Sequence, residues 1–364
     1  MLKVNANPIK VLVVDDSAFM RKVISDILNS DEEIEVIDTA RNGKEAIKKA
    51  AELKPDVITL DVEMPVMDGL TCLKELTKMR DIPVIMLSSH THEGADATIK
   101  ALEHGAIDFI TKPTNIFQIS SEDKKKELLE KVKVISRLKC NVPNRKQREV
   151  NEVKSFNTPK SVGKEENVGS ASIKKIVAIG ISTGGPKALR DVIPLIPANI
   201  PAAFLVVQHM PPGFTKSLAE RLDSISNVRV KEAEDNEIIK AGSVYIAPGD
   251  YHMKVGLNRD RTLQIKLTKD PPYGAHRPSA TVMMDSLSDT GLANLVGVIM
   301  TGMGGDGSEG AKRIKQENNG YIIAQDEKTS TVYGMPKVAV DLGIVDEIVP
   351  LNNITKKITE IVGV

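Results

Sequence analysis

The feature that most constrains the fold of this chain is a repeated alternation of short apolar runs with stretches of helical periodicity. Each run has the length of a buried strand, and the stretches between them, such as residues 43–53 and 70–79, place apolar residues on one face. Alternation of this kind predicts a parallel sheet that is covered by helices on both faces. The first expected strands are residues 9–14, 34–40, 57–60, 84–87 and 109–110, and a helix is expected at 121–138.

The pattern is interrupted once and then resumes. Residues 139–171 are rich in lysine, asparagine, glutamate, serine and glycine without sustained periodicity, which is the composition of a flexible linker. Because 364 residues exceed the usual length of one domain, we predict two doubly wound α/β domains. The first, residues 8–138, is expected to be flavodoxin-like, and the second and larger one spans residues 172–364. The second set of expected strands is residues 176–181, 203–208, 244–247, 296–300 and 321–324.

Charge and composition narrow the classes of partner. Lysine plus arginine and aspartate plus glutamate both number 49, so the zero net charge gives no support for nucleic acid or an anionic membrane as main partner. No apolar run approaches the ~20 residues that cross a bilayer, and the N-terminus has no apolar signal core. Neither Cys72 nor Cys140 has a metal-ligand spacing, and Cys72 lies in an apolar helical pattern typical of a buried thiol. We expect a reduced, cytoplasmic protein without membrane insertion or nucleic-acid binding.

Polar residues follow four strands of the first expected sheet. Asp15 and Asp16 come directly after the first strand, Asp61 after the third, Ser88 after the fourth and Lys112 after the fifth. In open α/β sheets the functional groups gather beyond the carboxyl ends of the strands, so these five side chains should converge at one edge.

The chemistry of this set favours phosphoryl transfer to a carboxylate. Clustered carboxylates repel one another unless a cation joins them, and hard oxygen ligands suit Mg²⁺. A carboxylate can attack phosphorus and form an acyl phosphate, and Asp61 stands alone at its strand end, free to do so. Lys112 would supply positive charge to the phosphoryl oxygens and Ser88 a hydroxyl. For any single residue the simpler interpretation is a helix cap, a role that Asp16 could fill, but the joint placement of all five favours the phosphoryl site.

The motifs VLVVDDSAFMR, ITLDVEMPVMDG, VIMLSS and DFITKP resemble those of response-regulator receiver domains over residues 9–138. The resemblance implies that Asp61 is the phosphorylation site. It also implies a Mg²⁺ ion held by Asp15, Asp16, Asp61 and the backbone carbonyl of Glu63, with Ser88 and Phe109 as switch residues beside Lys112. A chemotaxis histidine kinase is the implied phosphodonor.

A candidate nucleophile opens the second domain. The sequence Gly-Ile-Ser-Thr-Gly-Gly-Pro places Ser182 where a strand ends and a helix starts, and it matches GxSxG, in which a sharp turn exposes a serine hydroxyl. The N-terminus of a helix also favours an oxyanion. GxSxG is common by chance and is weak evidence alone, and the alternative is a tight strand-to-helix turn with a serine cap. A dinucleotide fingerprint fits less well, because Ser182 stands where the second glycine is needed.

The second domain also offers candidate bases and a candidate acid. His209 follows an apolar run and therefore sits at a strand end, whereas His276 lies in a polar loop suited to binding substrate or capping a helix. His252 is the least constrained. Asp306 lies in the glycine-rich loop Thr-Gly-Met-Gly-Gly-Asp-Gly, whose N–H groups could form an oxyanion hole. A turn with Asp306 as a helix cap is an equal alternative, and the loop is no Walker motif.

The motifs GISTGGP, QHMPPGFT, APGDYHM, HRPSATVMMDSL and MTGMGGDG resemble the catalytic domain of chemotaxis protein-glutamate methylesterases, from about residue 172 to the C-terminus. The resemblance implies Ser182 as nucleophile, His209 as base and Asp306 as the orienting acid, with N–H groups at Thr183 or Met303 for the oxyanion. The implied reaction, which needs no cofactor, hydrolyses glutamate methyl esters on methyl-accepting chemotaxis receptors for sensory adaptation. Deamidation of receptor glutamines is a further implied activity.

Two alternative outputs of the second domain fit the sequence less well. The alternative to an enzyme is a response regulator whose second domain only binds a protein or small ligand, and the Ser, His and Asp set argues against it. A DNA-binding output lacks a basic recognition helix. We further expect phosphorylation of Asp61 to act as a regulatory gate on Ser182, by shifting a closed-to-open equilibrium of the two domains.

Overall fold

The structure, a computed structural model, describes residues 7–79, 82–89, 91–112, 122–138 and 173–364. The expected linker at residues 139–171 and Pro113 of the DFITKP motif lie outside these residues. The described chain forms two parallel sheets, each covered by helices, and one separate antiparallel hairpin. Among the described helices, none combines the length and the apolar composition that a bilayer crossing needs.

The first domain is a five-stranded parallel sheet with strand order β2-β1-β3-β4-β5. Helices α1 and α6 contact each other on one face, and α2, α3 and α4 follow one another on the opposite face. This is the expected flavodoxin-like arrangement. Its elements are β1 (Ile9–Val14), α1 (Ala18–Asn29), β2 (Ile34–Ala40), α2 (Gly43–Leu53), β3 (Val57–Asp61), α3 (Gly69–Met79), β4 (Val84–Ser88), α4 (His92–Glu103), β5 (Asp108–Thr111) and α6 (Glu122–Ser136).

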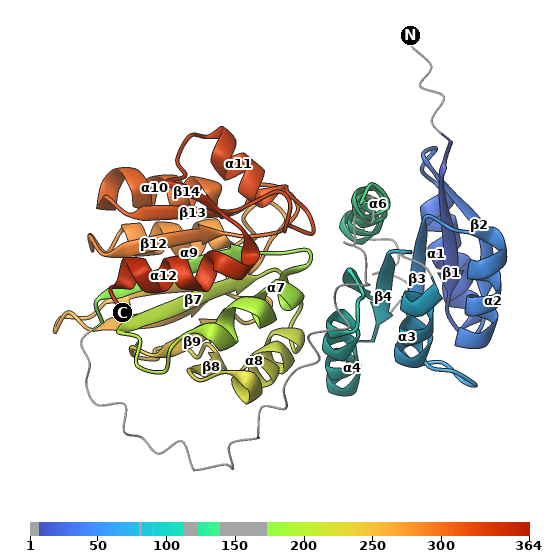
Figure 1. Cartoon of the computed structure of the whole chain (residues 1–364), viewed down its shortest axis with the longest axis horizontal. Helices are drawn as coiled ribbons and strands as arrows, with labels where there is room; N and C mark the ends of the chain where they lie inside the picture. Colours follow the sequence, from blue (N-terminus) through green and yellow to red (C-terminus); the bar gives the residue numbers. More distant parts are fainter. Residues whose placement is uncertain (1–6, 80–81, 90, 113–121, 139–172) are drawn as a thin grey trace, which may run out of the picture.

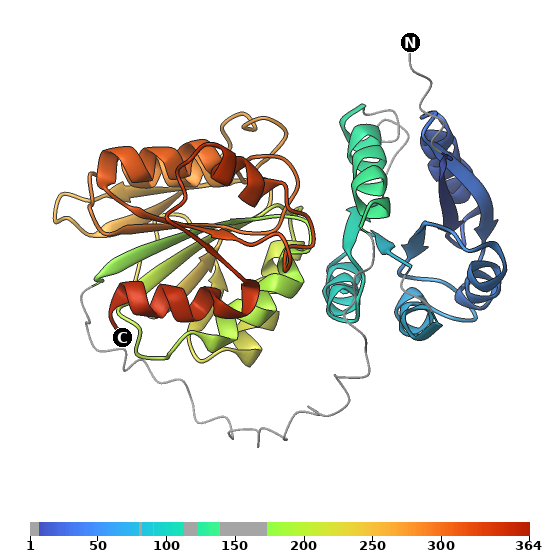
Figure 2. The ribbon, with the colours of Figure 1, turned by 45° about the horizontal axis from the view of Figure 1, so that its top comes forward.

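The second domain is a seven-stranded parallel sheet with strand order β14-β13-β12-β6-β7-β9-β8. Helices α9, α10 and α11 pack on one face, and α7, α8 and α12 lie on the other (Figure 2). Its elements are β6 (Lys175–Ile181), α7 (Gly185–Val192), β7 (Ala202–Gln208), α8 (Phe214–Ile225), β8 (Arg229–Glu232), β9 (Ser243–Ile246), β10 (His252–Leu257), β11 (Leu263–Thr268), α9 (Ala280–Ser288), β12 (Leu295–Ile299), α10 (Ser308–Asn318), β13 (Tyr321–Gln325), α11 (Met335–Asp341), β14 (Glu347–Val349) and α12 (Ile354–Val362).

The central strands explain why the apolar runs were informative. Every residue of β7 is buried, as is every residue of β12, because helices cover both faces of each sheet. The strands β1 and β3 are neighbours in the first sheet, and β6 lies between β12 and β7 in the second. In both domains the chain switches direction across the sheet at these strands, and the loops at their carboxyl ends border a crevice.

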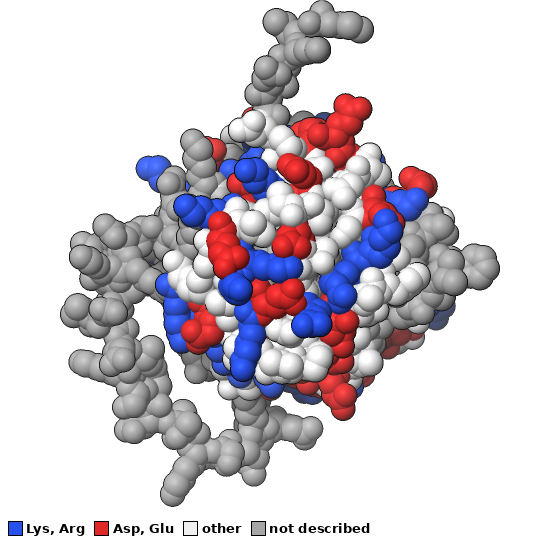
Figure 3. Space-filling model, turned by 90° about the vertical axis from the view of Figure 1, so that its right-hand side faces the viewer, with Lys and Arg blue, Asp and Glu red and all other residues white. Residues whose placement is uncertain are grey.

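The domains meet through α4 of the first domain, which packs against α7 and α8 of the second. Figure 1 shows α4 and α6 on the side of the first domain that faces the second. The opposite side, which carries α2 and β2, displays lysine and arginine side chains interspersed with aspartate and glutamate (Figure 3). The contact between the domains is therefore made by the side of the first domain that carries α4.

Candidate phosphorylation and active sites

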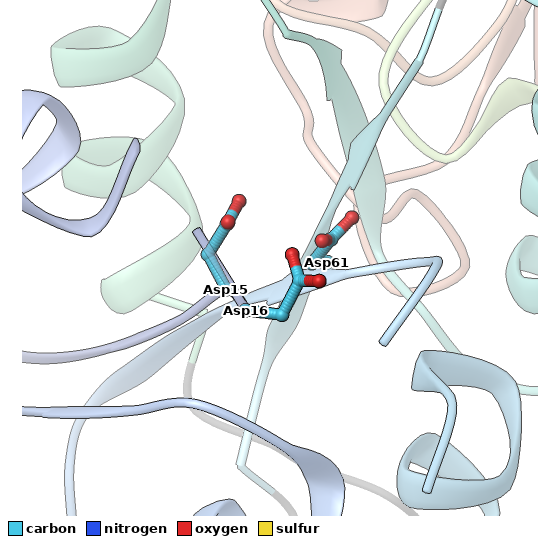
Figure 4. A group of neighbouring side chains, drawn as sticks. All are labelled: Asp15, Asp16 and Asp61. Carbon is cyan, nitrogen blue, oxygen red and sulfur yellow. The ribbon is translucent and has the colours of Figure 1, made fainter. Parts of the chain in front are cut away.

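Three aspartates converge at the crevice of the first sheet. Asp15 and Asp16 follow β1, and Asp61 ends β3, so that carboxylate oxygens of all three lie within 4.8 Å of one another (Figure 4). Asp15 and Asp61 are buried, whereas Asp16 is exposed. Ser17, and not Asp16, caps α1 through a bond from the N–H of Met20, so the alternative role of Asp16 as helix cap is wrong.

Lys112 supplies positive charge to this cluster. Its Nζ lies 2.7 Å from Oδ2 of Asp15 and 2.6 Å from Oδ2 of Asp61. Burial raises the pKa of Asp61 to about 6, although the hydrogen bond from Lys112 acts to lower it. A divalent cation between the three carboxylates would favour their ionised forms, and an all-oxygen donor set open to solvent through Asp16 suits Mg²⁺.

The other expected receiver residues surround the cluster. The N–H of Glu63 lies 3.3 Å from Oδ1 of Asp61, while its side chain points into solvent. Ser88 is buried at the end of β4, where its hydroxyl accepts a hydrogen bond from Thr98 and donates to the carbonyl of Gly94, both on α4. Ser88 therefore links the edge of the sheet to the helix that contacts the second domain.

Ser182 lies in the turn between β6 and α7. Its N–H donates to the carbonyl of Thr301 at 3.0 Å, and a Cβ at Gly302 would lie 2.8 Å from the Cβ of Ser182. The N-cap of α7 is Gly184, which has a φ of 77°, so Ser182 is not a helix cap. Within the described part of the chain, the half-buried Ser182 hydroxyl makes no hydrogen bond. The turn therefore leaves the serine hydroxyl unpaired among the described residues.

His209 directly follows β7, and it forms a buried pair with Asp306, which lies in the loop between β12 and α10. The Nε2 of His209 lies 2.7 Å from Oδ2 of Asp306, and the two side chains are 9% and 4% exposed. Nδ1 of His209 is buried and has no partner among the described residues. Because an ionised carboxylate only accepts hydrogen bonds, Nε2 carries the proton and Nδ1 is left free to accept one.

The Asp306 carboxylate is bound by four donors. Besides His209 they are the Ser279 hydroxyl and the N–H groups of Ala280 and Thr281 at the start of α9. Although burial acts to raise it, these bonds hold the pKa of Asp306 well below its usual range. Asp306 thus binds the N-terminus of α9, while its own helix, α10, is capped by Gly307. The alternative role of Asp306 as a helix cap therefore does not hold for α10, the helix that follows its loop, although Asp306 does bind the first N–H groups of α9.

The two remaining histidines differ in position. The ring of His276 stacks on the ring of His209, with centroids 3.9 Å apart and planes at 9°. Burial, and then repulsion from His209, lowers the pKa of His276 to about 4, so this ring is neutral at physiological pH. His252 is buried in β10, with Nε2 3.2 Å from the carbonyl of Pro271. His276 therefore covers the ring of His209, and Ser279 rather than His276 caps the next helix.

The N–H group of Thr183 follows Ser182 in the chain, and the N–H group of Met303 follows Gly302, which lies against Ser182. Neither donates a hydrogen bond in the described part of the chain. The Thr183 carbonyl accepts from the Thr301 hydroxyl at 2.9 Å, which ties the serine turn to the glycine-rich loop. In that loop Gly302 lies against Ser182, and Gly304 has a φ of 79°, in the left-handed region that favours glycine.

The first domain reaches this site directly. The Thr183 hydroxyl donates to Oδ2 of Asp108 at 2.9 Å, and Asp108 begins β5. Phe109 stacks on Phe214 with ring centroids 4.6 Å apart. Around this centre, Arg221 of α8 forms two hydrogen bonds with Glu103 of α4, at 2.7 and 3.1 Å. Sequence reasoning missed Asp108, although it lies in the DFITKP motif next to Phe109.

Known proteins share both parts of this arrangement. A family model described as CheB methylesterase matches residues 177–358, and one described as response regulator receiver domain matches residues 11–122. The chain is 48% identical to a protein-glutamate methylesterase/protein-glutamine glutaminase of Syntrophomonas wolfei, over 96% of this chain and 98% of the relative. A relative of the same name from Pyrococcus horikoshii is also 48% identical, over 98% of this chain and 94% of the relative.

A solved structure resembles the second domain. It is the CheB methylesterase catalytic domain of Thermotoga maritima, with a TM-score of 0.50 and 46% identity, covering 51% of this chain and 97% of the other. Both the matching family models and the extent of the identity lead to one conclusion: this chain belongs to the family of CheB methylesterases that carry a response regulator receiver domain.

Proposed function

We propose that the chain is a phosphorylation-regulated protein-glutamate methylesterase that acts in the cytoplasm on chemoreceptors during chemotactic adaptation. It hydrolyses glutamate γ-methyl esters and deamidates receptor glutamines, the two activities in the names of its relatives. The observation that carries the proposal is the buried His209–Asp306 pair, in which Nδ1 of His209 has no partner among the described residues. The N–H of His209 donates to the carbonyl of Ile181, which places this pair beside the turn that carries Ser182. We also propose the division into a first domain, residues 8–138, a linker, residues 139–171, and a second domain, residues 172–364.

In the proposed reaction Ser182 is the nucleophile and His209 the base. Nδ1 of His209 takes the proton from the Ser182 hydroxyl as the oxygen attacks the ester carbonyl carbon, and it returns that proton to the departing methoxide oxygen, which leaves as methanol. Water then attacks the acyl-serine in the same way and restores Ser182. Asp306 holds the proton of His209 on Nε2 and stabilises the imidazolium ion that forms.

The proposed oxyanion donors are the N–H groups of Thr183 and Met303. Both are free of other acceptors among the described residues, and both belong to backbone that hydrogen bonds hold in place, so they need no rearrangement during the reaction. The same donors serve ester and amide substrates, because both pass through tetrahedral intermediates.

In the first domain the proposed phosphoryl acceptor is Asp61, with a chemotaxis histidine kinase as donor. Asp15, Asp16, Asp61 and the carbonyl of Glu63 would hold Mg²⁺, whose charge offsets that of the carboxylates and the incoming phosphoryl group. Lys112 already contacts Asp61 and would pair with the phosphoryl oxygens. Ser88 and Phe109 would then change their contacts.

The proposed regulation is a closed-to-open equilibrium. Its support is the position of β5, which carries Asp108 and Phe109 against Thr183 and Phe214 on one side and precedes Lys112 on the other. In the closed arrangement the Asp108 side chain of the first domain accepts a hydrogen bond from Thr183, the residue next to Ser182. A rearrangement of Lys112 and Phe109 on phosphorylation would weaken this contact and free the site.

Methanol release from methylated receptor membranes tests the proposal. The full-length protein should release labelled methanol slowly by itself and faster with a small phosphodonor. The chain without its first domain should be active without a donor, provided that it remains folded by circular dichroism. Absence of release from all three samples would overturn the enzymatic assignment and favour a second domain that only binds its partner. An inactive deletion variant beside an active full-length protein would refute the inhibitory contact.

Removal of Mg²⁺ should separate the two domains functionally. A chelator is expected to prevent phosphorylation of Asp61 by a small phosphodonor, because three clustered carboxylates then repel the donor. Intact-protein mass spectrometry measures the phosphoryl group, and basal methanol release should stay unchanged. Phosphorylation at an undiminished rate in the chelator would contradict the metal site.

Reversal of charge at the edge of the interface should raise basal activity. Arg221→Glu faces Glu103, whose side chain is 10% exposed, so repulsion replaces an ion pair that is worth ~0.2–1 kcal/mol. We expect basal methanol release to increase about two- to five-fold, and the swap Glu103→Arg with Arg221→Glu to restore the low level. Arg229→Glu, an exposed change on β8, is the matched control. Equal activities of all these variants would argue against this interface as the closed state.

A further inference from the structure

Gln208, the last residue of β7, occupies an unusual place between the proposed nucleophile and base. It is 2% exposed, and its Nε2 donates to the carbonyl of Ser182 at 3.0 Å and to the carbonyl of His209 at 3.3 Å. Because both partners are carbonyl oxygens, which only accept, the NH₂ group of the amide must face them. One side chain thus bonds the backbone of both residues.

The bond to Ser182 bears on the oxyanion donor. The carbonyl of Ser182 and the N–H of Thr183 belong to one planar trans peptide unit, so they point in opposite directions. Two donors hold that carbonyl, the N–H of Gly185 at 2.8 Å and the amide of Gln208 at 3.0 Å. Whatever fixes the direction of the Ser182 carbonyl therefore also fixes the direction of the Thr183 N–H.

The cost of this arrangement indicates a use. Oε1 of Gln208 is buried without a hydrogen-bond partner among the described residues, an unfavourable state that a leucine at this position would avoid. A Cβ at residue 185 would overlap Oε1 of Gln208, so the second glycine of Gly184-Gly185 leaves room for the amide. The chain therefore tolerates an unpaired buried oxygen and keeps a glycine at residue 185 in order to hold the Gln208 amide here.

We propose that Gln208 is a positioning residue for ester hydrolysis, which aims the Thr183 N–H at the developing oxyanion. The inference rests on the proposed function, with Ser182 as nucleophile and Thr183 as an oxyanion donor. Gln208 touches neither the substrate nor the reacting atoms. It acts through the peptide unit that joins Ser182 to Thr183. Its second hydrogen bond, to the carbonyl of His209, ties the backbone of His209 to the same amide group.

Gln208→Leu tests the inference by a separation of kcat from KM. Loss of a whole oxyanion donor lowers kcat about 10²–10³-fold. Because Gly185 still holds the Ser182 carbonyl, we expect a smaller fall of about 10–100-fold, with KM for methylated receptor membranes changed less than two-fold. Asn318→Leu is the matched control. Asn318 is the last residue of α10, and the substitution removes a buried amide that donates to the carbonyl of Ser288. An unchanged kcat in Gln208→Leu would overturn the proposal.

Gln208→Glu keeps the shape and makes the donor depend on pH. The ionised carboxylate cannot donate to the Ser182 carbonyl, whereas the protonated acid can. The ratio of variant to wild-type kcat should therefore rise as pH falls, with each value corrected for the folded fraction at that pH. A purely structural role predicts a constant ratio, and that result would contradict the proposal even if the leucine variant failed to fold.

Gly185→Ala provides an independent check through the space beside the amide. In the wild-type background the added methyl group displaces the amide of Gln208 and should lower kcat by a similar factor. In a Gln208→Ala background the two closest contacts of the methyl group are gone, and only Cγ1 of Ile181, 3.0 Å away, must adjust. The same substitution should then change kcat less than three-fold. Equal losses of kcat in both backgrounds would show that Gly185 and Gln208 act independently, which contradicts the proposal.

The wild-type protein in the same assay distinguishes a failure of the proposed function from a failure of the role of Gln208. A wild type that releases no methanol overturns the proposed function and this inference with it. An active wild type whose Gln208 variants keep their kcat overturns this inference alone.

Discussion

Ser182→Ala is expected to abolish methanol release, with a fall in kcat of about 10⁶-fold, as when a serine hydrolase loses its nucleophile. The substitution removes only an oxygen that has no hydrogen bond in the described structure, while the Cβ that faces Gly302 stays. The fold should therefore be unaffected, and phosphorylation of Asp61 should proceed at the wild-type rate. Methanol release, thermal unfolding and intact mass together check the three expectations.

The control for this variant is Ser224→Ala, an exposed serine near the end of α8, which should keep full activity. Methanol release by Ser182→Ala above one thousandth of the wild-type rate would contradict the nucleophile assignment. An inactive variant that also loses phosphorylation would instead indicate a disturbed fold.

Asp306→Asn is expected to lower kcat by about 10⁴-fold. The asparagine amide offers an NH₂ group where the carboxylate accepted a hydrogen bond from Nε2. The His209 proton would therefore move to Nδ1, the nitrogen that must accept from Ser182. Substrate binding should change little, because Asp306 is buried behind His209. Steady-state kinetics on methylated receptor membranes measure both effects.

Asp306→Asn also has a consequence for stability, because the carboxylate binds the start of α9. Its low pKa means that this stabilisation is complete above the ordinary carboxyl pKa of 3.8 and is lost only as the pH falls further. The variant should thus melt earlier at neutral pH, and the difference should shrink in acid. Ser279→Ala separates stability from catalysis, since it removes a cap worth ~1 kcal/mol but keeps the Asp306–His209 bond. A kcat loss in Ser279→Ala as large as in Asp306→Asn would refute the assigned role.

The buried parallel strands could be predicted from sequence almost residue by residue. The bounds of β1 and β2 agree with the expected ranges. In an interior strand such as β1 the apolar run marks these bounds, because helices cover both faces of the sheet. The edge strand β8 and the hairpin of β10 and β11 were not predicted. Their residues are only partly buried and carry charged side chains, so no continuous apolar run marks them.

The placement of site residues was predictable where strand ends determine it. Asp15, Asp61 and Lys112 meet because parallel strands bring their carboxyl ends to one edge. The contacts between the two domains were not predictable in the same way. The bond between Thr183 and Asp108 joins residues 75 apart in the sequence, and it depends on how two domains pack, which no periodicity records.

That bond has a thermodynamic corollary. Thr183 contributes its hydroxyl to the contact with the first domain and its N–H to the proposed oxyanion site, so substrate and first domain compete for one residue. Linkage is reciprocal: if phosphorylation favours access of a methylated receptor, the bound receptor must favour the phosphorylated state by the same factor. The substrate would then act as an effector of Asp61, and a receptor rich in methyl esters would prolong the activation of the enzyme that removes them.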